Sequence, residues 1–151
     1  MLSKPQLDDD GNVAPHDHEE ILDSDHIIRR ISRVHHCVPD ANLQCDRLST
    51  KAMRPNSGGM SVDHQRSIEE AGLDPREFVT NPDYIASVVF QAGAARALTL
   101  RVGYDPVPEN DFHCEVWGAN PKNFTSAQQD GLINACEWFV EAPGVRIVKK
   151  P

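Results

Sequence analysis

The order of secondary-structure signals along the chain is what most constrains its fold. Runs that favour strands, because they are β-branched or alternate apolar with polar residues, lie at residues 26–34, 83–90, 98–104, 112–118 and 144–150. Helical patterns separate them irregularly, without strand–helix alternation or an internal repeat. We therefore predict an α+β fold over residues 20–151, a single compact domain with a mostly antiparallel mixed sheet and two or three helices.

The helices are predicted from their end signals. In residues 61–73, Asp63 is a plausible N-cap and Gly72 supplies the C-terminal stop. Further along, Thr125 and Gln128 form a capping box at the start of the clearest helix. Its apolar stripe at helical spacing consists of Leu132, Ile133, Cys136, Phe139 and Val140. Residues 26–34 also fit a helix, but their β-branched composition favours a strand.

Residues 1–19 are predicted to be a disordered acidic tail. They combine three consecutive aspartates, Asp8 to Asp10, with few large apolar groups, which cannot offset the entropy lost on ordering. The stretch "HDHEE" at residues 16–20 offers weak metal ligands, but a solvated acidic tail is the preferred interpretation.

Composition narrows the classes of partner. The formal net charge of −8 repels phosphates, so nucleic acid and anionic membranes are not expected as partners. The N-terminus lacks the apolar run of a secretory signal, and no stretch is apolar enough to span a membrane. We therefore expect a cytoplasmic protein, whose partner is a small anionic ligand or a basic protein. Its oligomeric state cannot be derived from the sequence.

The four cysteines, Cys37, Cys45, Cys114 and Cys136, form no CxxC pair. In a reducing cytosol we expect them to be free thiols. A zinc site from His35, His36, Cys37 and Cys45, with His113 or Cys114, matches no closed-site template. No metal site is therefore assigned, and no motif identifies a cofactor.

Five polar residues at the predicted ends of separate elements form the candidate site: Arg30, His35, Ser61, His113 and Glu115. An arginine offers a fixed fork for phosphate or carboxylate, and a histidine titrates near neutral pH. A glutamate on a strand polarises a hydroxyl. Arg29 replaces Arg30 if the strand register is shifted by one residue.

One resemblance concerns the order of three polar motifs. An arginine on the first strand, the Ser-Thr pair in "RLSTKAM" and a late glutamate resemble the Arg, Ser-Thr-Ser, Glu order of ADP-ribosyltransferases. In that family the arginine and serine hold NAD and the glutamate orients the acceptor. The resemblance implies these roles for Arg30, Ser49 (or Ser61) and Glu115. The chain departs from the family's order because no second serine follows Thr50.

A second resemblance covers residues 27 to about 140. "IIRRI", "RLSTKAMRP", "GGMSVD", "FQAGAARAL" and "DPVPENDFHCEVWG" are similar to stretches of small bacterial proteins of unknown function. It implies a single compact domain and a bacterial source, and it leaves the activity open.

The residues together predict a polar cleft around Arg30, Ser61 and His113 that binds a small anionic or nucleotide-like ligand. A noncatalytic acidic protein that binds a basic partner, of the antitoxin or immunity type, is the alternative from another class. An enzyme similar to ADP-ribosyltransferases is the third. The sequence does not decide whether catalysis takes place.

Overall fold

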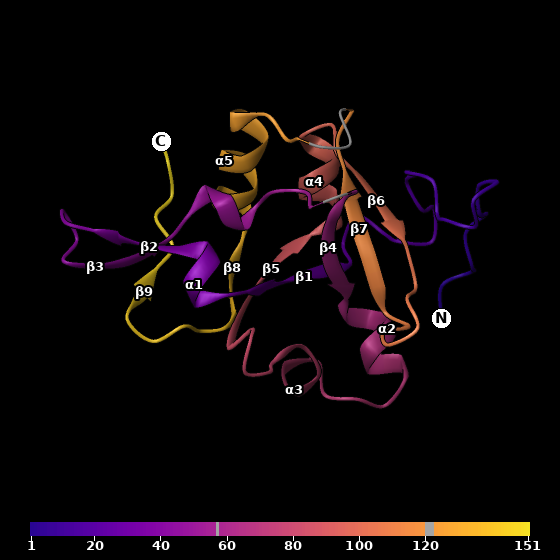
Figure 1. Cartoon of the computed structure of the whole chain (residues 1–151), viewed down its shortest axis with the longest axis horizontal. Helices are drawn as coiled ribbons and strands as arrows, with labels where there is room; N and C mark the ends of the chain where they lie inside the picture. The colour runs from indigo at the N-terminus through magenta and orange to yellow at the C-terminus, as the bar shows by residue number, and fades with distance from the viewer. Residues whose placement is uncertain (57, 120–122) are drawn as a thin grey trace.

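A six-stranded antiparallel sheet organises the fold. The computed structural model describes residues 1–56, 58–119 and 123–151. The strands follow one another across the sheet in the order β6-β7-β4-β1-β5-β8 (Figure 1). Their bounds are β1 His26–Ile31, β4 Met60–His64, β5 Ala86–Gln91, β6 Arg101–Tyr104, β7 His113–Trp117 and β8 Glu137–Val140. Every neighbouring pair is antiparallel, which confirms the predicted fold class.

A smaller sheet of three strands lies near the C-terminal end of the chain (Figure 1). It consists of β2 Cys37–Asp40, β3 Cys45–Leu48 and β9 Val145–Arg146. β2 and β3 pair antiparallel, whereas β9 runs parallel to β3. The sheet system is therefore mixed, as predicted.

Helices cover both faces of the large sheet, and those in the described part of the chain are short. Their bounds are α1 Arg33–His36, η1 (a 3₁₀ helix) Thr50–Ala52, α2 Gln65–Glu70, α3 Pro75–Val79, α4 Ala92–Ala97 and α5 Ser126–Ala135. These are more helices than the two or three predicted, because single turns such as α1 leave little periodicity in a sequence.

Two apolar clusters flank the sheet. Ile27 and Ile31 of β1 belong to the main core, together with residues of α4, α5 and η1. Ile28 points to the other face, into a small cluster with Ile68 of α2 and Val79 of α3. Figure 1 shows α4 and α5 on one side of the sheet and α2 and α3 on the other. The small cluster covers only part of its face.

Residues 15–18, in the segment predicted to be an acidic tail, run along the edge strand β6. The backbone N–H of His18 donates to Val102 O (2.9 Å), and the N–H of Val102 donates to the carboxylate of Asp17 (2.9 Å). Leu2 is buried in the main core. These contacts satisfy backbone groups that an open sheet edge leaves exposed, and they offset the low apolar content of the segment.

Two predicted element ends are corrected. Asp63 does not cap a helix: β4 continues through His64, whose side chain caps α2 by accepting the N–H of Ser67. The capping box of Thr125 and Gln128 is confirmed, but α5 ends at Ala135. The apolar residues beyond it form β8, because pairing with β5 satisfies their backbone groups.

The four cysteines are free thiols. Among the helices of the described residues, none combines the length and the apolar character that crossing a bilayer requires.

A buried network ties the start of α2 to the loop before β1. His64 Nδ1 lies 2.7 Å from the Ser67 hydroxyl, and Nε2 lies 2.8 Å from the Asp25 carboxylate. Arg66 also donates to Asp25. Burial opposes ionisation of Asp25, but the hydrogen bonds from Arg66, His64 and the N–H of Leu22 outweigh it and hold the pKa of that carboxyl well below its usual range. Because Asp25, His64 and Ser67 are buried, we assign the network a scaffold role.

We predict that acid destabilises the fold through His36. Burial, with Arg29 and His35 nearby, lowers the pKa of His36 from 6.5 to about 4. The unfolded chain therefore binds a proton before the native chain does. Stability present above pH 6.5 is lost as the pH falls toward 4, by about 3 kcal/mol for this group. Urea unfolding at several pH values measures the loss.

The variant His36→Asn keeps an acceptor for the N–H of Ser32, which donates to His36 Nδ1 over 2.8 Å. In this variant the slope of the free energy of unfolding against pH should decrease by the equivalent of about one bound proton. His26→Asn, at an exposed position, should leave it unchanged. An unchanged slope in His36→Asn contradicts the prediction.

Candidate functional site

The large sheet opens between β1 and β4. β1 pairs with β5 along its whole length, from His26 to Ile31. It pairs with β4 only at Ile27↔His64 and Ile28↔Asp63. Beyond that point the two strands separate, and the carbonyl of Ser61 has no β1 partner. A cavity lies at this separation and is lined by residues of both strands.

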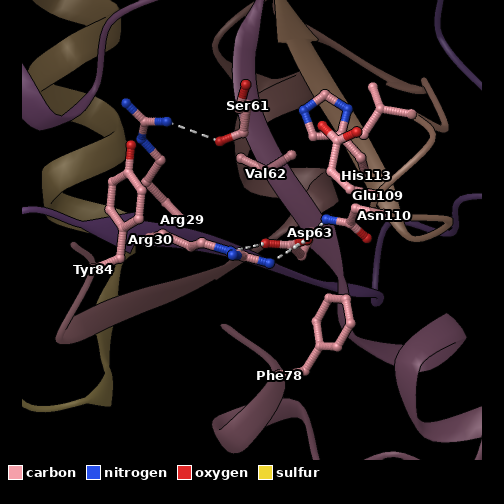
Figure 2. Close-up of a pocket in the computed structure, with 11 residues that line it drawn as sticks. Arg29, Arg30, Ser61, Val62, Asp63, Phe78, Tyr84, Glu109, Asn110 and His113 are labelled. Atoms are coloured by element: carbon pink, nitrogen blue, oxygen red, sulfur yellow. Dashed lines mark hydrogen bonds and ion pairs between the residues drawn. The ribbon is translucent and has the colours of Figure 1, made fainter. Parts of the chain in front are cut away.

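Arg29 bridges this gap. Its Nε donates to the carbonyl of Ala52 in η1 over 2.9 Å. Its Nη1 donates to the carbonyl of Ser61, also over 2.9 Å (Figure 2). The guanidinium thus takes the place of the missing strand pairing. A guanidinium carries five N–H donors, so donors remain after these two bonds.

The cavity has a volume of about 430 Å³ and is lined by side chains from β1, β4, α3, the loop before β5, the loop before β7 and β7 itself. We call it the β1–β4 cleft. Figure 2 shows Arg29, Arg30, Ser61, Tyr84, Asn110 and His113 around it. Ser61 is exposed on its strand. Among the described residues, its hydroxyl makes no hydrogen bond with another side chain.

Arg30 is neutralised within the cleft. Its Nε lies 2.9 Å from Asp63 Oδ2, and its Nη2 lies 3.4 Å from Oδ1. Asn110 donates a further bond of 2.6 Å to the same carboxylate. The guanidinium lies 5.5 Å from the centre of the Phe78 ring. Arg30 is therefore held in place by both a charge and an aromatic face.

Arg29 differs because, in the described part of the chain, no carboxylate forms an ion pair with it. Its polar contacts are the two neutral carbonyls. Burial lowers the pKa of Arg29 to about 10, although Tyr84, Asp63 and Glu115 act in the opposite direction. At neutral pH it is still a cation, but one that has lost much of its hydration without gaining a counter-ion. Such a charge attracts an anion.

Two carboxylates, of Asp105 and Glu115, lie beside His113 but outside the set of residues that line the cleft. Gly103 of β6 is in register with Glu115 of β7. His113 Nδ1 donates to the carbonyl of Asp105 over 2.7 Å and lies 3.8 Å from its carboxylate. Glu115 accepts the N–H of Gly59 over 2.6 Å. Burial raises the pKa of Glu115 and Asp105 adds to that rise, while Gly59 and His113 oppose it.

Three of the five predicted site residues, Arg30, Ser61 and His113, line the β1–β4 cleft together. Glu115 neighbours His113 on the same strand face but does not line the cavity. His35 lies in an adjacent hollow beside Tyr84. Whether any of them binds a ligand stays a prediction.

Sequence reasoning missed Tyr84, Asp63, Asn110 and Asp105. The sequence signal of Asp63 favours a helix cap, which conceals its role as the partner of Arg30. Asp105 follows a strand, and only the pairing of β6 with β7 places it beside His113. The sequence offers Arg29 only as a substitute for Arg30, because neighbouring residues on a strand point to opposite faces. Both reach the cleft since β4 separates from β1 there while it stays paired with β7.

The alternative groupings are not assembled in the described residues. Ser49 is buried and caps η1 by accepting the N–H of Lys51, so it does not share a cavity with Arg30. His36 of the considered zinc set accepts the N–H of Ser32. Within the part of the chain that the structure describes, the group of metal-ligand type is Asp105, His113 and Glu115.

Comparison with known proteins adds no relative. No protein-family model, curated protein or solved structure matches the chain. The two resemblances therefore stay predictions, and the geometry of the cleft is the basis for its interpretation.

We predict that Arg30 and Asp63 depend on each other for stability. Arg30→Gln leaves a carboxylate that is 4% exposed without its cation, which should cost about 3 kcal/mol. The double variant Arg30→Gln/Asp63→Asn removes both charges and should lose clearly less. Urea unfolding of the single and double variants measures this coupling. Additive losses would contradict it.

Proposed function

We propose that this protein binds a small anionic ligand, nucleotide-like in character, in the β1–β4 cleft. The observation that carries the proposal is Arg29, a mostly buried cation at the floor of an open cavity without a carboxylate partner among the described residues. A ligand phosphate or carboxylate supplies the missing counter-charge. The remaining N–H donors of the guanidinium fork suit either group.

The other cleft residues support a ligand with both polar and planar parts. The hydroxyls of Ser61 and Tyr84 and the amide of Asn110 offer hydrogen bonds. The rings of Phe78 and Tyr84 offer apolar surface on which a planar base can pack (Figure 2). A few polar groups within partly apolar walls are typical of small-molecule sites.

We predict that one added negative charge at Ser61 weakens anion binding. Ser61→Asp places a carboxylate beside the cleft at an exposed position, and Ser61→Asn is its neutral match in shape. Repulsion should weaken the binding of an anion by at least about tenfold in Ser61→Asp relative to Ser61→Asn. The probes are inorganic phosphate, AMP, ATP, NAD and citrate, and calorimetry measures their dissociation constants.

Thermal unfolding of both variants checks that they remain folded, and Arg146→Gln, which removes an exposed arginine outside the cleft, controls for net charge. The proposal would be overturned if none of the five probes bound to the wild type. Equal binding of a probe by Ser61→Asp and Ser61→Asn would also overturn it.

Binding to a basic protein is the second candidate. The net charge of −8 favours a basic partner. Beside the cleft, Val34 is 84% exposed, and Ile85 and Tyr84 add further exposed apolar surface around the same hollow. Such binding should weaken with salt and with charge reversal at the exposed Asp83, to which anion binding in the cleft is less sensitive.

A further inference from the structure

Three potential metal ligands meet at the β6–β7 side of the cleft. Asp105, His113 and Glu115 each offer one ligand atom, and these atoms all lie within 4.8 Å of one another. Ligands of one zinc ion stand about 2.0–2.2 Å from the metal. Two donors of one such ion stand roughly 3.4 Å apart. The three donor atoms therefore have to approach one another by about an ångström, which rotation of the side chains allows. Asp105 follows directly after β6 and Glu115 lies in the middle of the neighbouring strand β7, so the pairing of the two strands brings them together.

The tautomer of His113 suits this role. Its Nδ1 lies 2.7 Å from the carbonyl of Asp105, which only accepts hydrogen bonds. Nδ1 therefore carries the proton in the neutral ring, and Nε2 keeps its lone pair. A metal-binding histidine commonly donates its other ring N–H to a backbone carbonyl in this way.

The Glu115 carboxylate packs against Gly59, which has no side chain. Gly59 donates its N–H to the carboxylate over 2.6 Å. A Cβ at Gly59 would lie 2.5 Å from that same oxygen. A larger residue would therefore displace the carboxylate, and the backbone bond directs it toward its neighbours.

The two carboxylates lack a protein cation of their own. In the described ranges, neither Asp105 nor Glu115 forms an ion pair with a lysine or arginine. Asp105 is 23% exposed and His113 is 14% exposed, so water screens the group only in part. Like charges this close repel each other, and a bound cation removes the repulsion.

We propose that Asp105, His113 and Glu115 bind one divalent first-row transition-metal ion, of which Zn²⁺ is the representative. One imidazole nitrogen and two carboxylate oxygens suit such an ion, whereas Mg²⁺ and Ca²⁺ prefer oxygen ligands throughout. Three protein ligands leave coordination positions open. This site does not require the anion site, although His113 lines the cleft that the anion would occupy.

The test uses the full-length protein after treatment with a chelator. Calorimetry with Zn²⁺ alone should show one equivalent bound with a micromolar or lower dissociation constant. Titration with Co²⁺ should give visible absorption bands that report its coordination. Mg²⁺ at the same concentration should not compete.

The decisive variants keep the shape of each ligand. Glu115→Gln retains an acceptor for the N–H of Gly59, and Asp105→Asn retains the carbonyl that orients His113. Each should weaken Zn²⁺ binding at least tenfold. His35→Gln and Asp83→Asn, in the adjacent hollow, are the matched controls and should bind as the wild type does. Nitrogen NMR of the histidine side chains should show Zn²⁺ on Nε2 of His113.

Absence of stoichiometric Zn²⁺ binding would overturn the proposal. Equal binding by Glu115→Gln, Asp105→Asn and the wild type would also overturn it, because the ion would then sit elsewhere, for example at the histidines of residues 16–18. Thermal unfolding of each apo variant confirms that it is folded. Ser61→Asp separates the two sites, since its added carboxylate repels an anion but does not repel Zn²⁺.

Discussion

The cleft depends on the two hydrogen bonds that the guanidinium of Arg29 donates to backbone carbonyls. Where β1 and β4 part, the carbonyl of Ser61 has no partner on β1. Arg29 supplies one donor to that carbonyl and another to Ala52 of η1. An arginine can do this because its planar fork carries several fixed donors. The same side chain therefore closes the sheet and places an uncompensated charge at the floor of the cavity.

The buried histidine network fixes the other end of β4. His64 is paired with Ile27 on β1 and is also bound to Ser67 and Asp25. β4 is thus clamped at this end, while its first residues stay paired with β7. Since both ends are held, the separation from β1 is a fixed feature of the fold. A cavity set by such constraints is preorganised, so a ligand spends little free energy on ordering it.

How much the sequence could predict depended on whether the signal was local. The alternation in residues 112–117 correctly indicates a strand with His113, Glu115 and Trp117 on one face, and the capping box of Thr125 locates the start of α5. These signals involve residues that are close along the chain. The end of α5 was missed because an apolar stripe continues equally well into a buried strand, and only pairing with β5 decides between them.

The site shows the same division between local and long-range information. Polar residues at element ends pointed to Arg30, Ser61 and His113, but the roles of these residues follow from partners far along the chain. The separation in sequence is 33 residues for Arg30 and Asp63, and 56 for Gly59 and Glu115. A one-residue shift in strand register changes which side chains share a face. Only the sheet pairing identifies Arg29 as the cation without a partner.

The charges in and around the cleft are separated by sign. Arg29 lies at the β1 side, the carboxylates of Asp105 and Glu115 lie at the β6–β7 side, and Asp63 between them is already paired with Arg30. The small apolar cluster under α2 and α3 leaves this part of the sheet face uncovered. The β1 side therefore lacks an anion, and the β6–β7 side lacks a cation. Under the two proposals, an anion at Arg29 adds to the negative charge near Asp105 and Glu115, and a metal ion there removes it. If both ligands bind, electrostatic attraction between them would make each favour the binding of the other.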